Sequence, residues 1–304
     1  FFSAAEKPKL GLFLSLAAGA TNIVFDYVFI ALLDMGVTGA AWATVLSQGV
    51  SGLLCLGYAW RRFPLLRMEK RHWTFDWSYA WKHLRLALPM AMQFVITGTS
   101  VLVNQAVLNL FGSAAVAAFS AASKIHMLSE QVAVSFGTAM ATYAGQNYGA
   151  GKAGRVREGL RKCALACEAI TLGIMVIMTA FGGVMSSWFI DGYHPEVIQQ
   201  AHLYLFISAL FYPALTMLFL YRNTLLGLGN GVTPMLAGVC ELLSRMIGAP
   251  VLGHFFGFTG LCWINPIAWV TASGLLFLSY RKTMRNIRPV DPTVDASDSN
   301  KIMN

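Results

Sequence analysis

The sequence predicts an all-α integral membrane protein with eight transmembrane helices. Of its 304 residues, 56% are hydrophobic and only 12% are charged, whereas about 25% of the residues in a soluble domain are charged. Apolar runs of roughly 20 residues recur along the chain, which is the length that a helix needs to cross a bilayer. The formal charge of +8 does not indicate a nucleic-acid-binding protein, because the basic residues lie between the apolar runs.

The first two spans form a predicted hairpin. The run at about 12–33 contains Asp26 and ends at a turn, and the second run covers about 38–60. We assign residues 1–60 to the last two helices of a first lobe. Residues 61–83 are then a cytoplasmic linker, in which the aromatic and basic segment WTFDWSYAWKHLR is typical of an interfacial helix.

The third and fourth spans, about 84–110 and 114–145, carry most of the polar candidates. The third begins near Pro89 and contains Gln93, Gln105 and Asn109. The fourth is rich in Ala, Ser and Gly, carries Glu130, and stops at the motif GQNYGAGK. Small residues let helices approach closely, and a membrane-embedded acid must find a partner or bind something. The fourth helix is therefore predicted to pack against protein.

Four further spans complete a six-helix bundle over residues 84–282. They cover about 163–188, 201–221, 234–252 and 258–280, and a polar cytoplasmic tail follows at 283–304.

Of the 22 Lys and Arg residues, 20 fall in one set of alternate connections, and only Lys124 and Arg245 lie within spans. Because Lys and Arg are held on the cytoplasmic side, both ends of the chain are predicted to be cytoplasmic.

A short pattern occurs twice at an offset of 221. It reads Gly36, Thr38, Gly39, Trp42 in the first copy and Gly257, Thr259, Gly260, Trp263 in the second. Each copy begins the second helix of a hairpin on the non-cytoplasmic side, so the repeat is parallel. The repeat predicts a twelve-helix parent protein in two bundles, with four helices and about 135 to 140 residues preceding Phe1.

Signatures of catalysis and metal binding were not found. GAGK resembles part of a phosphate loop, but the required first glycine is replaced by Gln146 and the Ser or Thr by Ala153. The five cysteines lie in or beside apolar spans without zinc or disulfide spacing. The sequence predicts neither an enzyme nor a metal site.

Several segments resemble the multidrug and toxic compound extrusion (MATE) transporters. AVAAFSAASKIHMLSEQVAVSFGTAMATYAGQNYGAGKAGRVREGL is similar to the eighth helix and following cytoplasmic loop of that family, and LLGLGNG and DMGVTGAAWAT are similar to further family segments. The resemblance covers nearly the whole chain and maps it onto family helices five to twelve. The last six spans then form one complete bundle of a two-lobe transporter.

This resemblance implies a secondary antiporter of the bacterial inner membrane. Such proteins export amphipathic, often cationic compounds by rocking two bundles, with sodium ions or protons as coupling ions and no other cofactor. Small-molecule substrates and membrane lipid are the expected partners. Many family members carry an acid eight residues after the proline that is Pro89 here, but this chain has Thr97. No carboxylate lies between Ala201 and Tyr221, and the aspartate of the first family helix would precede this chain.

Two acids carry the strongest site hypotheses. Glu241 and Arg245 are four residues apart on one helix face, either as a self-neutralised pair or with Arg245 holding Glu241 ionised for a cation or proton. Glu130, one turn after His126, either lines a cavity and contacts a cation or makes an interhelix hydrogen bond. Asp26, four residues after Asn22, either binds a proton or a cation or makes a helix cap or an interhelix polar contact, of which the polar contact is favoured. Gln93, Gln105 and Asn109 are candidates for the lining of a wet cavity.

Two alternatives to the antiporter remain open. A lipid-linked oligosaccharide flippase of the same superfamily would be favoured by a cavity rich in basic residues. The chain could instead be an inactive truncated membrane scaffold, because half of a two-lobe cavity is absent from it. Transport by the intact protein separates these possibilities.

Overall fold

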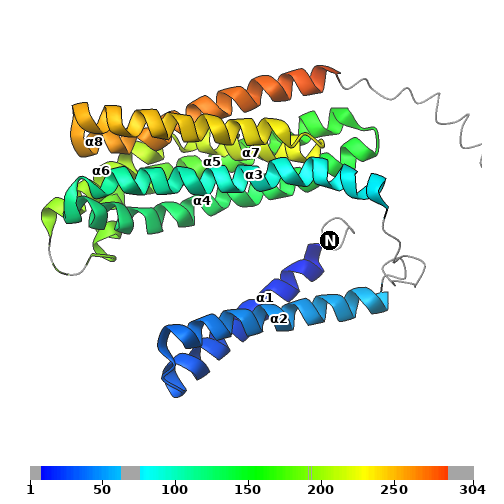
Figure 1. Ribbon diagram of the computed structural model, residues 1–304, viewed down its shortest axis with the longest axis horizontal. Coiled ribbons are helices and arrows are strands. Elements are labelled where there is room, and N and C mark those ends of the chain that lie inside the picture. The colour runs from blue at the N-terminus through cyan, green and yellow to red at the C-terminus, as the bar shows by residue number, and fades with distance from the viewer. Residues whose placement is uncertain (1–7, 63–75, 191, 193, 287–304) are drawn as a thin grey trace, which may run out of the picture. The chain divides into compact units, whose positions relative to one another are not determined.

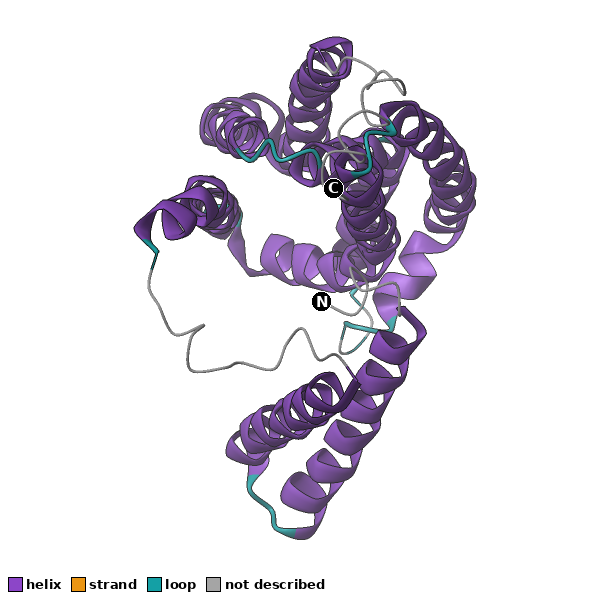
Figure 2. Ribbon diagram, turned by 90° about the vertical axis from the view of Figure 1, so that its right-hand side faces the viewer, coloured by secondary structure: helices purple, strands orange, loops and turns teal. Residues whose placement is uncertain are grey.

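The computed structural model describes residues 8–62, 76–190, 192 and 194–286. Within these ranges every regular element is a helix, and short turns join the helices (Figures 1 and 2). The chain divides into two compact units, residues 1–80 and 81–304, each with its own packing. The predicted all-helical fold is confirmed.

Unit 1 is a helical hairpin. It contains α1 (Pro8–Asp26), η1 (Tyr27–Leu32) and α2 (Gly36–Arg62). The sequence predicted one regular helix to about residue 33, but the last six residues of that helix, η1, adopt π-helical geometry. The turn is closed by a hydrogen bond from the Met35 amide to the Phe29 carbonyl, 2.9 Å.

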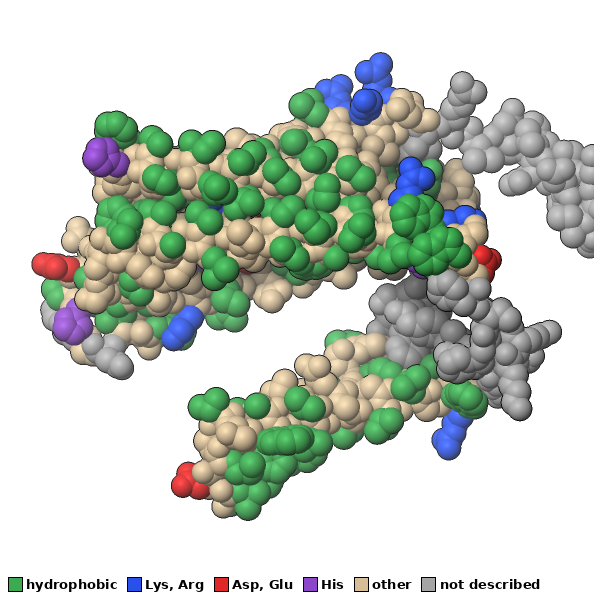
Figure 3. All heavy atoms as spheres, in the orientation of Figure 1, with side chains coloured by type: hydrophobic (Ala, Val, Ile, Leu, Met, Phe, Trp, Pro, Cys, Tyr) green, Lys and Arg blue, Asp and Glu red, His purple; other side chains and the backbone are tan. Residues whose placement is uncertain are grey.

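Unit 2 is a bundle of long helices that lie side by side (Figure 1). They are α3 (Trp77–Asn109), α4 (Gly112–Gly149), α5 (Ala153–Ser187), α6 (Pro195–Leu210), α7 (Tyr212–Gly227) and α8 (Val232–Asn286), of which the first turn of α3 belongs to unit 1. Buried apolar residues from α4 to α8 form its main core, among them Ala144, Leu205, Leu220 and Leu276. Apolar side chains also cover the outer face seen in Figure 3, and the Lys and Arg side chains visible on this unit lie mostly at one end. This surface is suited to contact with lipid.

The predicted spans differ from the observed helices in two places. The sixth span is broken at Phe211 into α6 and α7, which are bent by 54°. Pro213 explains this break, because proline lacks an amide hydrogen and its ring clashes with the carbonyl one turn earlier. The seventh and eighth spans appear as one 55-residue element, α8, with non-helical geometry inside it at Gly257.

A composition test of the described helices gives five that are long and apolar enough to span a membrane, or six if α6 and α7 count as one span. The number is below eight partly because α8 holds two predicted spans in one element. Helix α4 is not among them, although its 38 residues exceed the length needed to cross a bilayer. It packs against other helices of the bundle, as the sequence predicted, and its buried residues are mainly alanines, with Gly137 as the one buried glycine among them.

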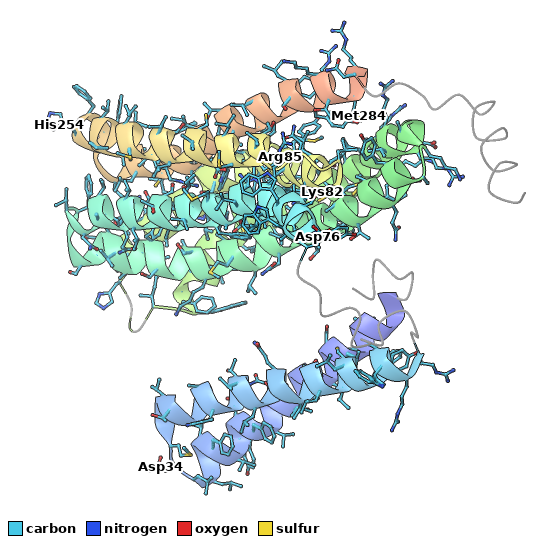
Figure 4. All side chains as sticks on the ribbon, turned by 45° about the vertical axis from the view of Figure 1, so that its right-hand side comes forward. Asp34, Asp76, Lys82, Arg85, His254 and Met284 are labelled. Carbon is cyan, nitrogen blue, oxygen red and sulfur yellow. The ribbon has the colours of Figure 1, made fainter. Side chains whose placement is uncertain are left out.

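Element ends also differ from the sequence-based boundaries. Helix α4 continues through Gly145 to Gly149, and α5 starts at Ala153, so the basic residues after GQNYGAGK lie on the first turns of α5. Residues from Trp77 onward form the start of α3 rather than a separate interfacial helix. The rest of that segment, 63–75, and the tail from 287 lie outside the described residues. Within unit 2, Figure 4 shows Lys82, near the start of α3, toward the same end as Met284, and His254 at the other end.

The two copies of the glycine pattern share a positive-φ glycine at the turn and a close helix approach after it. Gly36 and Gly257 both have positive φ, 54° and 60°. A Cβ atom added at Gly39 would lie 3.0 Å from the Phe29 carbonyl oxygen, and one added at Gly260 would lie 2.0 Å from that of Leu252. In each copy the first glycine makes the turn and the later one lets the second helix approach the first. The sequence repeat therefore corresponds to a structural repeat.

Candidate functional site

A cavity of about 420 Å³ opens within unit 2. Helices α3, α4, α6, α7 and α8 contribute to its wall. Its polar or titratable lining residues are Thr97, Asn104, Gln105, Ser123, His126, Glu130, Tyr204, Arg222, Glu241, Arg245 and Asn265. Its apolar wall includes Phe119, Leu215, Leu218, Phe219 and Trp269. Small-molecule sites typically have volumes of roughly 300 to 1,000 Å³ and combine apolar walls with a few polar groups, as this cavity does.

Two arginines enclose one buried carboxylate in this wall. The Arg222 guanidinium donates a hydrogen bond to one oxygen of Glu241, and Nη2 of Arg245 lies 3.6 Å from the other. All three residues are buried, with exposed fractions of 6 to 8%. The cluster carries two positive charges and one negative charge, so its net charge is +1. A buried ion pair requires such close partners because desolvation of each charge is costly.

Further hydrogen bonds fix Arg245 across the bundle. Its Nη1 donates to the Ser100 hydroxyl at 2.7 Å, and its Nε donates to Oδ1 of Asn265 at 3.1 Å. Nδ2 of Asn265 in turn donates to the Tyr204 hydroxyl at 3.0 Å. Arg245 thereby connects α3, α6 and the two halves of α8. Its role is structural as well as electrostatic.

Helix α7, which carries Arg222, lies close to α4. A Cβ atom added at Gly137 would lie 2.7 Å from Nδ2 of Asn223, and one added at Gly227 would lie 2.3 Å from the Ala141 carbonyl oxygen. Arg222 packs over the ring of Phe219, with 5.7 Å between the guanidinium carbon and the ring centroid. Its Nε is buried and has no hydrogen-bond partner among the described residues.

Glu130 lies on α4, in the wall of the same cavity. Its side chain is 32% exposed, and one carboxylate oxygen is 4.0 Å from Nε2 of His126. Nδ1 of His126 is hydrogen-bonded to the Tyr212 hydroxyl at 2.8 Å, and the imidazole stacks on Trp269 at a centroid distance of 5.4 Å. His126 is held firmly, whereas Glu130 keeps an open side toward the cavity.

The structure brings together four of the seven site candidates. Glu130, Glu241, Arg245 and Gln105 line the cavity, and Thr97 lies in the same wall. Three candidates do not line it. Asn109 accepts a hydrogen bond from Gln105, 3.1 Å; Gln93 packs beside Gly238; and Asp26 belongs to unit 1 at the end of α1.

Sequence reasoning missed Arg222, which it placed in a cytoplasmic connection. The structure corrects this assignment, because Arg222 is only 7% exposed and points into the bundle from α7. The signal was the apolar run that continues after it, Leu225, Leu226 and Leu228, for another turn. Lys124 does lie on the outside, over the ring of Phe189 at 5.3 Å. Among the described residues of unit 2, two arginines are therefore buried, Arg222 and Arg245.

The MatE family model matches residues 89–251, more than half of the chain. Among curated relatives, the chain is 29% identical over 262 residues to the probable multidrug resistance protein YpnP of Bacillus subtilis, a match that covers 84% of this chain and 55% of that protein. It is 28% identical over 299 residues to the probable multidrug resistance protein NorM of Mesorhizobium japonicum, covering 92% and 62%.

A solved structure gives the same fold. A MOP superfamily transporter from Pyrococcus furiosus superposes with a TM-score of 0.85 at 20% identity, covering 92% of this chain and 64% of that one. The chain thus spans between 55% and 64% of the length of these three proteins.

Proposed function

The chain belongs to the MatE family, and on that premise we propose that the intact protein is a secondary antiporter that exports amphipathic compounds by rocking two helix bundles. Unit 2 supplies the second bundle, and its cavity binds the substrate. The observation that carries the proposal is a cavity inside the bundle whose wall combines apolar side chains with four charged ones. Ionisable groups in membrane segments typically mark substrate or ion pathways.

The coupling ion is a proton or sodium. Glu130 is the carboxylate in this cavity with an open side, whereas both oxygens of Glu241 lie beside arginines. Exchange at Glu241 would require breaking a buried charge cluster, which is costly. We therefore assign the exchangeable acid of this lobe to Glu130, and a structural role to Glu241.

Transport by the intact protein tests the proposal. Proteoliposomes that hold the full-length protein are given an imposed proton or sodium gradient, and uptake of anionic, neutral and cationic amphipathic dyes is followed. We expect at least one gradient to drive uptake, and its removal by an ionophore to stop it. Because Glu130 is assigned as the exchangeable acid, Glu130→Gln is expected to reduce gradient-driven uptake. The control is Lys124→Gln, which removes a charge on the outer surface and is expected to leave uptake unchanged. Uptake that is indifferent to both gradients contradicts antiport.

A lipid-linked oligosaccharide flippase is the second candidate. One observation favours it: Arg222 adds a second buried cation to the cavity, and a flippase would need basic groups to hold a phosphate-linked lipid. Translocation of a fluorescent pyrophosphate-linked lipid in the same proteoliposomes, without transport of the dyes, would replace the antiporter proposal by this one.

A further inference from the structure

The last turns of α8 carry three basic side chains on one outward face. The described residues that line a pocket at this end of the helix are Leu278, Arg281, Lys282, Arg285 and Asn286. The three basic residues are exposed, and with Leu278 they follow the spacing i, i+3, i+4 and i+7. Residues three and four apart are neighbours on a helix surface, so these side chains form one face. We call this set of three basic residues the basic face of α8.

The opposite side of the same turns shows which way the basic face points. Leu276, Tyr280 and Met284, four residues apart, are buried in the main core of unit 2. Figure 4 shows Met284 near the end of α8. Because residues at this spacing lie on one side of a helix, the basic face is on the side away from the bundle. It is therefore accessible to a partner outside unit 2.

No described acid balances the charge of the basic face. Residues 242–286 contain no Asp or Glu, and within the described ranges no carboxylate forms an ion pair with Arg281, Lys282 or Arg285. Arg281 lies over the ring of Phe277 at 5.6 Å, a contact made by the plane of the guanidinium and not by its N–H groups. The helix dipole contributes only about half a negative charge at this terminus. The end of α8 thus has a local excess of positive charge.

An exposed apolar stripe leads along α8 to the basic face. Ile267, Val270 and Leu278 are exposed at helical spacing, and Gly274 lies between the last two. A Cβ atom added at Gly274 would have no neighbour within 4 Å, so the stripe is indented there. At about 1.5 Å per residue, the stripe from 267 to 278 is about 16 Å long. This length matches one leaflet, since the hydrocarbon core of two leaflets is about 30 Å thick.

We propose that this surface binds one anionic phospholipid, with the phosphate at the basic face and an acyl chain along the apolar stripe. A soluble phosphate would balance the charges and leave the stripe uncovered. A zwitterionic lipid would cover the stripe without balancing the charges. A phospholipid with a net negative headgroup does both. The proposal does not depend on the antiport function, because it concerns the outer surface of α8 rather than the cavity.

The chemistry of the three side chains suits a phosphate group. The guanidinium groups of Arg281 and Arg285 can each donate paired hydrogen bonds to phosphate oxygens, and the Lys282 ammonium adds a compact charge. Each Lys or Arg near an anionic lipid surface strengthens binding by about fivefold, so three together are expected to give up to about 100-fold. Salt reduces this gain, because the basic face is exposed to solvent.

Three matched ligands test the proposal on the purified intact protein in neutral detergent micelles. Dioleoyl phosphatidylglycerol is anionic, dioleoyl phosphatidylcholine has the same tails with a zwitterionic head, and glycerol 1-phosphate has the anionic group without tails. Bound lipid is counted by native mass spectrometry, and affinity is measured by displacement of a fluorescent phosphatidylglycerol. We expect phosphatidylglycerol to bind about 10- to 100-fold more tightly than phosphatidylcholine, and glycerol 1-phosphate not to displace it.

A triple variant removes the charges of the basic face. Arg281→Gln, Lys282→Gln and Arg285→Gln in one chain are expected to lower phosphatidylglycerol affinity to that of phosphatidylcholine. Binding of phosphatidylcholine should stay unchanged, which shows that the outer surface of α8 is still folded. The conservative double variant Arg281→Lys with Arg285→Lys keeps the charge, and is expected to retain most of the preference for phosphatidylglycerol.

A matched control removes the same number of charges elsewhere. Lys152→Gln, Arg155→Gln and Arg161→Gln neutralise three exposed basic residues at the start of α5. That region also carries Glu158, whose carboxylate lies 2.6 Å from Nζ of Lys162, so its positive charge is partly balanced. This control variant is expected to keep the preference for phosphatidylglycerol.

Three results overturn the inference. Equal affinity for the two lipids would show that the basic face does not select a headgroup. Equal loss of affinity in the α8 and α5 triple variants would show a general effect of surface charge. Full displacement by glycerol 1-phosphate would show a site for soluble phosphate. These measurements use no gradient, so a failure of the antiport proposal would leave them unaffected, and their failure would leave the antiport proposal unaffected.

Discussion

The two hairpins that share the glycine pattern have the same glycines at and after the turn, but they carry different charged side chains. One is residues 8–62, and the other is α8, residues 232–286. In both, a positive-φ glycine makes the turn and a second glycine brings the next helix against the first. The first arm of the earlier hairpin has one charged residue between positions 10 and 33, Asp26. The first arm of α8 carries Glu241 and Arg245, both buried.

The turns also differ in length. The carbonyl that faces Gly39 belongs to Phe29, ten residues earlier, whereas the one that faces Gly260 belongs to Leu252, eight residues earlier. The earlier hairpin therefore has two more residues between these points, where it forms the π-helix η1. A π-helical turn accommodates additional residues without ending the helix. The comparison shows that the glycines determine the turn and the close approach of the two helices. Other positions of the hairpin can differ, and in α8 they carry the buried charges of the candidate site.

The largest difference between the hairpins should come from their acids. Glu241→Gln leaves two buried arginines without a carboxylate and is expected to lower the free energy of unfolding by about 3 kcal/mol or more. Asp26→Asn in the other hairpin should cost less than about 1 kcal/mol. Reversible denaturation in micelles measures both. Glu158→Gln is the control, because its exposed pair with Lys162 contributes little. Equal losses for the two acids would contradict the comparison.

The close-approach glycines should give the next largest effect. A Cβ atom at Gly260 would meet the Leu252 carbonyl at 2.0 Å, so Gly260→Ala is expected to destabilise by about 3 kcal/mol. Gly39→Ala, with its contacts at 3.0 Å, should cost about 1 kcal/mol. Gly274→Ala, on the same helix α8 with open space around it, is the matched control. Thermal unfolding that ranks Gly39 above Gly260 would be the opposite result.

The turn glycines should give smaller and more similar effects. Both have positive φ and no neighbour within 4 Å of an added Cβ atom, so backbone strain alone decides the outcome. Gly257→Ala and Gly36→Ala are each expected to cost about 1 to 3 kcal/mol, because a positive φ strains alanine. Gly49→Ala, in the interior of α2, should be neutral or stabilising. Tolerance of alanine at one turn and not the other, seen as a shift in unfolding midpoint, would show that the two turns are not equivalent.

Local spacing predicted the parts of the candidate site that lie on one helix. Glu241 and Arg245, four residues apart, do form an ion pair, and His126 and Glu130 face each other at the same spacing. Polar residues on the third predicted span were assigned to a cavity as a group, but Gln105 lines it and Gln93 does not. The spacing of residues along a helix shows which of them share a face. It does not show which other helix, or which cavity, that face contacts.

Contacts between residues on different helices could not be predicted from the sequence. Arg222 was assigned to a loop, because a basic residue at the end of an apolar run fits the positive-inside pattern as well as it fits a buried partner. Its partner Glu241 lies 19 residues away on another helix, α8, which no spacing along one helix predicts. The hydrogen bond of Arg245 with Ser100 joins residues 145 apart. No local pattern encodes a pair at that separation.

The sequence by itself determined that this chain is a helical membrane protein with a repeated hairpin and acids inside its spans. Hydrophobic run length, turn glycines and four-residue spacings act locally, so they can be read along the chain. Only the tertiary structure decided which charges meet. The cavity obtains its charge balance from Arg222, Glu241, Arg245 and Glu130 on three separate helices, and the sign of that balance depends on packing rather than on any one segment.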